Sequence, residues 1–127
     1  MITGIGVDRI AIKRVEAAIA RHGERFITRL FTAGEIAQAR AKGNPVRRFA
    51  MLFAAKEAVS KALGTGLRQG VTLQGIETIH QASGKPEVTL YDGAKSIADG
   101  LNIRSVHLSL TDDDGVAMAF AVAETAD

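Results

Sequence analysis

The chain has 127 residues, of which 46% are hydrophobic and 24% charged, and this suits one globular domain over residues 1–127. It contains no cysteine, which excludes disulfides, thiolate zinc sites and cysteine nucleophiles. The net charge of +2 conceals an asymmetry, because residues 1–70 hold 13 basic and 5 acidic side chains while residues 71–127 hold 3 and 9. A basic half predicts an anionic partner, which is nucleic acid, a phosphorylated cofactor or an acidic protein.

The first third of the chain predicts one short strand followed by helices. Residues 2–10 are β-prone and contain two glycines, which in a strand mark the close approach of another backbone or of a ligand. Helices are expected over 11–21, 24–30 and 32–42. Gly23 separates the first two helices, and Thr32 with Glu35 forms the capping box of the third.

The middle of the chain predicts one long buried helix. Asn44 is a favourable N-cap, Pro45 suits the first helical position, and Gly64 ends the helix. Within it, residues 49–63 read FAMLFAAKEAVSKAL, and twelve of these fifteen are uncharged. A helix that is apolar nearly all round is buried in the protein.

The last part of the chain predicts mostly strands. Strands are expected over 75–81, 87–90, 106–111 and 116–123, with a helix over 91–101 and a glycine-rich loop over 64–70. The run Asp112–Gly115 is a strong turn signal between the last two strands. The last strand alternates large and small apolar residues, which predicts that both of its faces are covered. This order of elements favours an α+β domain.

Glu57 and Lys61 are the charges of the long helix that most suggest a site. As a surface i,i+4 pair they would contribute only about 0.2–0.5 kcal/mol, and this interpretation stays open. On a buried helix, however, unpaired charge is costly, and a metal with phosphate groups would compensate it. Asp8, which ends the first β-prone run, is either a turn residue or a second carboxylate. Mg²⁺ prefers one or two carboxylates together with phosphate oxygens and water, so Asp8 and Glu57 fit it.

Four blocks of the sequence occur together in one known family. They are GIGVDRI at 4–10, the residues Arg25, Phe26, Arg29, Phe31 and Thr32, FAAKEAVSKALGTG at 53–66, and HLSLTDD at 107–113. In their order and spacing, and over essentially the whole chain, these blocks resemble the holo-acyl-carrier-protein synthases, the short phosphopantetheinyl transferases.

The resemblance implies an α+β fold in which an antiparallel sheet packs with a long buried helix, and a homotrimer with active sites between subunits. It implies transfer of 4′-phosphopantetheine from coenzyme A to a serine of an acidic acyl carrier protein, which releases adenosine 3′,5′-bisphosphate. Mg²⁺ would be the cofactor, and fatty acid biosynthesis the pathway.

The resemblance also assigns site residues by position. Asp8 and Glu57 match metal ligands, and Lys61 matches the lysine that contacts the pyrophosphate, so these three are the implied catalytic residues. The loop beside the nucleotide corresponds to Gly64, Thr65 and Gly66. A strand that lines the coenzyme pocket, contributed by a neighbouring subunit, corresponds to His107 and Thr111.

One position departs from the family pattern. Leu52 stands where the family has an arginine that helps to hold the phosphates of coenzyme A. Arg48 or Arg47, one helical turn earlier, is the expected replacement.

A basic surface is expected to dock the carrier protein. Arg14, Arg21 and Arg25 would lie within about 40° of each other on one continuous helix. A solvated basic face is the alternative interpretation of these three residues. His22 and His80 have no supporting pattern and are read as surface residues.

Two other functions remain as alternatives. The basic half favours a nucleic-acid-binding domain, although aromatic residues are only 5% and no stacking motif occurs. Leu52 favours a non-catalytic subunit that retains the fold. The sequence has no signal-peptide pattern at its start and no apolar stretch of about 18 residues, so we expect a cytoplasmic protein without contact to membrane.

Overall fold

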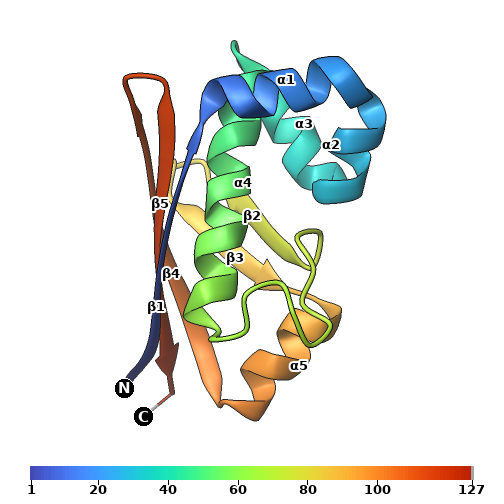
Figure 1. Cartoon of the computed structure of the whole chain (residues 1–127). Coiled ribbons are helices and arrows are strands. Elements are labelled where there is room, and N and C mark those ends of the chain that lie inside the picture. The colour runs from blue at the N-terminus through green and yellow to red at the C-terminus, as the bar shows by residue number, and fades with distance from the viewer. Residues whose placement is uncertain (127) are drawn as a thin grey trace.

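The computed structural model describes residues 1–126, which form a long central helix, two antiparallel sheets beside it, and shorter helices near its two ends (Figure 1). The elements in chain order are β1 (Ile2–Ala11), α1 (Ile12–His22), α2 (Glu24–Leu30), α3 (Ala33–Ala41), α4 (Pro45–Ala62), β2 (Ile76–His80), β3 (Pro86–Leu90), α5 (Asp92–Gly100), β4 (Ile103–Asp113) and β5 (Val116–Thr125). The α+β class and the element order expected from the sequence are confirmed, and the boundaries differ by a few residues.

The two sheets lie on different sides of α4. The larger sheet has the order β1-β5-β4, so the N-terminal and C-terminal strands pair with each other, and the smaller sheet consists of β2 and β3. Figure 1 shows α4 lying along the larger sheet, with β2, β3 and α5 beyond it. The long buried helix is therefore the common centre of both halves of the fold.

Small residues let α4 approach the larger sheet closely. A Cβ atom added to Gly4 would lie 1.8 Å from the carbonyl oxygen of Ala62, and one added to Gly6 would lie 1.8 Å from that of Ala58. The alanines of β5 are buried against the same side of α4; they are Ala117, Ala119, Ala121 and Ala123. The glycines of β1 thus mark the approach of another backbone.

The prediction that both faces of the last strand are covered is wrong for the single chain. Met118 is 39% exposed and Phe120 is 47% exposed, on the face of β5 that points away from α4. Ile5 and Val7 of β1 lie on the same face, because they pair in register with Val122 and Phe120. Within one chain, β5 has a buried face of small residues and an exposed face of large ones.

Local signals set several element ends as expected. Thr32 and Glu35 form the capping box of α3, and the Asn44 side chain accepts a hydrogen bond from the Arg47 amide at the start of α4. Asp114 and Gly115 both have positive φ, which fits a type I′ turn between β4 and β5. Within residues 1–126, no helix has the length and apolar character needed to cross a membrane.

Candidate functional site

Asp8, Glu57 and Lys61 come together where β1 crosses α4. Asp8 pairs in register with Ala119, so its side chain points to the α4 side of the sheet, as Gly4 and Gly6 do. The Lys61 ammonium donates to Asp8 Oδ1 at 3.1 Å and to the Val7 carbonyl oxygen at 3.0 Å. Lys61 therefore pairs with a carboxylate from a distant part of the chain, rather than forming only a local pair with Glu57.

The carboxylates of Glu57 and Asp8 are close enough for their negative charges to interact. The Glu57 side chain is half-buried, and this burial raises the pKa of Glu57. The negative charge of Asp8 raises this pKa further, and Lys61 opposes both effects. Two carboxylates that repel each other next to an exposed ammonium form a site suited to a cation on one side and an anion on the other.

The loop after α4 lies one helical turn beyond Lys61. Gly64 has a φ of 84° and Gly66 a φ of 59°, which places both in the left-handed region. The Gly66 amide donates to the Ser60 carbonyl oxygen at 3.1 Å, and the Thr65 hydroxyl donates to the Gly66 carbonyl oxygen at 2.7 Å. The loop thus folds back onto the end of the helix that carries Lys61.

His107 and Thr111 do not join the carboxylates within one chain. They pair in register with Val122 and Met118, on the sheet face that points away from α4. The ring of His107 lies 2.9 Å from a carboxylate oxygen of Glu124 on that face. Asp8 is on the opposite face, so the single chain does not bring these two residues to the carboxylates.

Arg48 also lies away from the carboxylates. It is nine residues before Glu57, which is half a turn round the helix, and it lines a hollow with Leu52, Gln38 and His80. The side chains of Arg48 and Leu52 therefore line the same hollow. Arg47 is engaged elsewhere, because its guanidinium donates to both carboxylate oxygens of Asp112, at 2.9 Å and 2.6 Å.

His80 is not the plain surface residue that the sequence suggested. It is half-buried, and burial lowers the pKa of His80, with further lowering from the positive charges of Arg48 and Lys42. Its place in the strand offered no signal, because only the tertiary fold brings α3 and α4 beside it.

The proposed docking arginines do not share one helix. Gly23 has a φ of 62° and separates α1 from α2, which run in different directions (Figure 1). Arg14 and Arg21 are exposed on α1, whereas Arg25 lies on α2. The expected break at Gly23 is confirmed, so the spacing that these arginines would have on one continuous helix does not apply.

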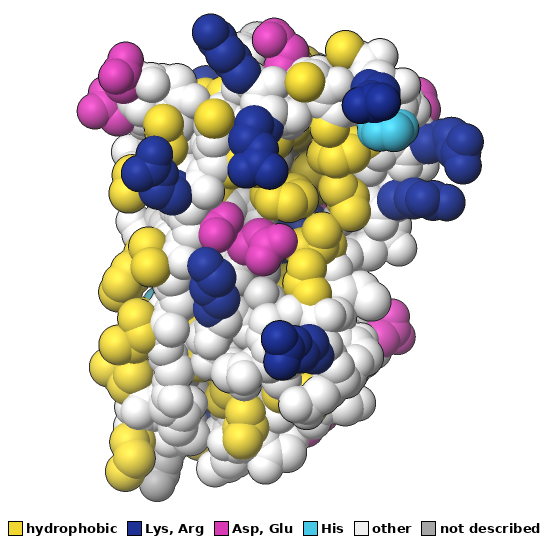
Figure 2. Space-filling view, viewed as in Figure 1, with side chains coloured by type: hydrophobic (Ala, Val, Ile, Leu, Met, Phe, Trp, Pro, Cys, Tyr) yellow, Lys and Arg dark blue, Asp and Glu magenta, His cyan; other side chains and the backbone are white. Residues whose placement is uncertain are grey.

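Arg25 instead lines an open hollow. The other residues that line it are His22, Phe26, Arg29 and Leu30. Figure 2 shows basic side chains gathered over the α1–α2 end of the molecule, with apolar surface between them and acidic side chains nearer the middle of this face. The surface therefore combines positive charge with an apolar depression.

The sequence did not predict the fully buried ion pair between Lys56 and Glu35. The ammonium lies 2.7 Å from a carboxylate oxygen, and neither side chain has any exposed surface. The signal available was the position of Lys56 in the middle of the bulky apolar stripe of α4. Glu35 was identified only as part of the capping box, a role that it also fills.

Comparison with known proteins gives concordant results. The model of the 4′-phosphopantetheinyl transferase superfamily matches residues 4–121. The chain is 46% identical over 124 residues to a holo-[acyl-carrier-protein] synthase of Vibrio cholerae, covering 98% of both chains. The structure of the Neisseria meningitidis synthase superposes with a TM-score of 0.91 at 38% identity, covering 98% of this chain and 100% of that one. The Helicobacter pylori synthase, solved in complex with coenzyme A, gives a TM-score of 0.81 at 31% identity, with 94% and 99% covered.

Proposed function

The chain belongs to the 4′-phosphopantetheinyl transferase superfamily, and we propose from this membership that Asp8, Glu57 and Lys61 are its catalytic site. The enzyme transfers 4′-phosphopantetheine from coenzyme A to a serine of an apo acyl carrier protein. The observation that supports the site best is the convergence of Asp8 on Glu57 and Lys61 across some 50 residues of sequence. This function replaces the nucleic-acid-binding and non-catalytic alternatives; a cytoplasmic location and a role in fatty acid biosynthesis remain predictions.

The direct test is a transfer assay. The protein is incubated with coenzyme A, Mg²⁺ and an apo carrier protein of proven competence, and the carrier is weighed by mass spectrometry. A gain of one phosphopantetheine group is expected. A carrier of unchanged mass would overturn the function.

The residues of the site have distinct roles in the proposed reaction. The carrier serine oxygen attacks the phosphorus that bears pantetheine, and the bond from this phosphorus to the bridging oxygen breaks, releasing adenosine 3′,5′-bisphosphate. Glu57 accepts the serine proton. Lys61, held by Asp8, stabilises the negative charge of the leaving phosphate.

Asp8 and Glu57 fit Mg²⁺ by the chemistry of their side chains. They supply two carboxylates, and in residues 1–126 no group of three or more potential metal-ligating side chains occurs. Mg²⁺ typically binds one or two carboxylates and takes its remaining ligands from substrate phosphates and water. When bound there, it would neutralise charge on the pyrophosphate.

Mg²⁺ should stabilise the protein in a manner that depends on pH. The folded-state pKa of Glu57 is raised, so its contribution to stability is lost as pH rises through that value. At pH 8, bound Mg²⁺ should offset the repulsion between the ionised carboxylates of Asp8 and Glu57. It should raise the melting temperature by about 2–8 °C for each kcal/mol of binding energy. The shift should shrink as pH falls and Glu57 becomes protonated.

Differential scanning fluorimetry with and without MgCl₂ measures this shift. Asp8→Asn should reduce it strongly, whereas Asp99→Asn, which changes an exposed carboxylate on α5, should leave it intact. An equal shift in all three proteins would exclude Asp8 as a ligand.

A homotrimer with sites between subunits is supported by the exposed sheet face. Its apolar residues are Ile5, Val7, Met118 and Phe120, which form a contiguous patch across β1 and β5. Contiguous exposed apolar surface marks a protein contact. The neighbouring strand β4 carries His107 and Thr111 on the same face, so burying this patch would bring them to a subunit boundary.

Arg48 is the proposed substitute for the family arginine. It lines the same hollow as Leu52, and Arg47 is engaged by Asp112. Arg48 would have to reach a phosphate of coenzyme A from the side of α4 opposite to Glu57. Its planar guanidinium suits paired hydrogen bonds to phosphate.

The carrier protein is proposed to dock on the α1–α2 surface. Arg25→Glu should lower kcat/KM for the carrier about tenfold, mainly through slower association, and should leave KM for coenzyme A unchanged. The same variant should weaken the dependence of the rate on NaCl concentration. Arg104→Glu, an exposed charge reversal on β4, is the matched control. Equal salt dependence in wild type and Arg25→Glu would contradict docking at this surface.

A further inference from the structure

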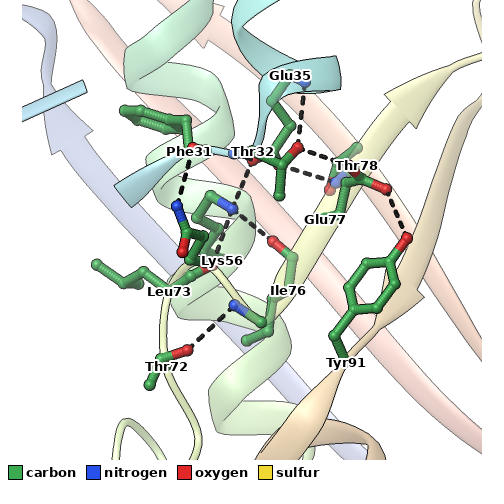
Figure 3. A network of polar contacts seen from close by, with 12 residues as sticks. Phe31, Thr32, Glu35, Lys56, Thr72, Leu73, Ile76, Glu77, Thr78 and Tyr91 are labelled. Carbon is green, nitrogen blue, oxygen red and sulfur yellow. Dashed lines mark hydrogen bonds and ion pairs between the residues drawn. The ribbon is translucent and has the colours of Figure 1, made fainter. Parts of the chain in front are cut away.

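A buried ammonium joins three separate segments of the chain (Figure 3). Lys56 Nζ lies 2.7 Å from Glu35 Oε1 on α3, and it donates to the carbonyl oxygens of Leu73 at 2.8 Å and Ile76 at 2.5 Å. Neither charged side chain is exposed. One side chain of α4 thus fixes α3, the end of the loop that follows α4, and the start of β2.

Glu35 and Gln38 in turn supply hydrogen-bond partners to the free edge of β2. Glu35 Oε2 accepts from the Thr78 amide at 2.9 Å, and Gln38 accepts from the His80 amide at 2.8 Å and donates to its carbonyl at 2.9 Å. The other edge of β2 pairs with β3. Two side chains of α3 therefore replace a neighbouring strand, and α3 and β2 are held together as one unit.

This unit is joined through α4 to the groups proposed to carry out transfer. Lys56 immediately precedes Glu57, so the rotation of α4 that buries Lys56 also sets the direction of Glu57 and Lys61. The loop that begins with Gly64 returns to Lys56 at Leu73. Rotation of α4 would leave the ammonium or the Glu35 carboxylate buried without its partner, which is strongly unfavourable.

We propose that Lys56 and Glu35 are positioning residues for the transfer reaction. They fix the rotation of α4 and the course of residues 64–75, and so hold Glu57, Lys61 and the Gly64–Gly66 loop in place for the substrate. The inference rests on the proposed function for its kinetic consequence. Its structural consequence, a loop held rigid by a buried charge, can be measured without substrate.

The test uses the double variant Glu35→Gln with Lys56→Met, which removes both charges and keeps side chains of similar length. At a temperature well below melting, kcat should fall about 100-fold, because a misplacement of about 1 Å in a catalytic group has an effect of that size. KM for the carrier protein should stay within about twofold, since α1 and α2 are not altered. Exchange of the Gly66 and Val71 amides in D₂O should become at least about tenfold faster.

The matched control is Arg47→Met with Asp112→Asn, which also neutralises an ion pair between α4 and another element. It should lower the melting temperature without changing kcat or Gly66 exchange. If the Glu35/Lys56 double variant behaves like this control, the pair only stabilises the fold and the proposal is overturned.

Glu35→Gln alone serves if the double variant does not fold, because it removes the charge of the carboxylate while keeping its shape and one acceptor oxygen, for either Lys56 or the Thr78 amide. It should lower kcat about tenfold and loosen the loop amides, and unchanged values of both would overturn the proposal. A wild-type protein without transfer activity would instead remove the proposed function. In that case the amide exchange of wild type and variants would still decide whether the pair holds the loop.

Discussion

Replacing Glu57 by glutamine should lower the turnover of phosphopantetheine transfer by about 10³-fold while the protein stays folded. The amide keeps the shape of the side chain but neither accepts the serine proton nor offers a charged ligand to Mg²⁺. The stability of the variant should equal or exceed that of the wild type at pH 8 without metal. This follows because burial and Asp8 make the ionised form of Glu57 unfavourable in the folded state.

Mass spectrometry of the carrier protein gives the rate, and thermal denaturation gives the stability. Asp99→Asn is the matched control. It also replaces a carboxylate by an amide, but the Asp99 side chain is exposed on α5, away from the site. Near-normal turnover of Glu57→Gln at saturating Mg²⁺ would show that Glu57 is neither the base nor an essential ligand.

Replacing Gly6 by alanine should have the largest effect on folding. The added Cβ would lie 1.8 Å from the Ala58 carbonyl oxygen and 2.8 Å from the Ala62 amide nitrogen. Both are backbone atoms of α4, so β1 and α4 must move apart. Overpacking of this kind costs about 3 kcal/mol or more, which corresponds to a fall in melting temperature of roughly 10 °C or more.

The same change should also abolish transfer. Asp8 is two residues further along β1, and its contact with Lys61 depends on the close approach of the strand to the helix. Gly43→Ala is the control, because a Cβ there meets no atom within 4 Å. If Gly6→Ala melts at the wild-type temperature and retains the ion pair, the close packing of β1 on α4 is not what positions Asp8.

Much of the fold could be predicted because its signals are local. The capping box at Thr32 and Glu35, the start of α4 at Asn44 and the turn at Asp114 and Gly115 each depend on residues a few positions apart. The burial of α4 followed from its composition alone. The exposed face of β5 could not be predicted, because alternation of apolar residues shows that a face prefers to be covered but not whether the same chain covers it.

The site was only partly predictable for a related reason. Glu57 and Lys61 could be identified from a helix in which charge is rare, and the resemblance added Asp8. The ion pair of Lys61 with Asp8, and that of Lys56 with Glu35, join residues whose separation in sequence carries no signal of contact. The relative position of the docking arginines could not be predicted, because the positive φ at Gly23 changes the direction of the chain between α1 and α2.

By itself the sequence determined the order of the elements, the burial of the central helix and the types of charged residue that the proposed site contains. These follow from short-range backbone preferences and from the exclusion of apolar side chains from water. The tertiary structure alone determined which charged side chains form ion pairs with each other. It buried the ion pair of Lys56 with Glu35 and brought Lys61 into an ion pair with Asp8. It also placed His107 and Arg48 on surfaces that face away from the Asp8 and Glu57 carboxylates. Electrostatic partners are set by distance in space, and only the packing of α4 between two sheets fixes those distances.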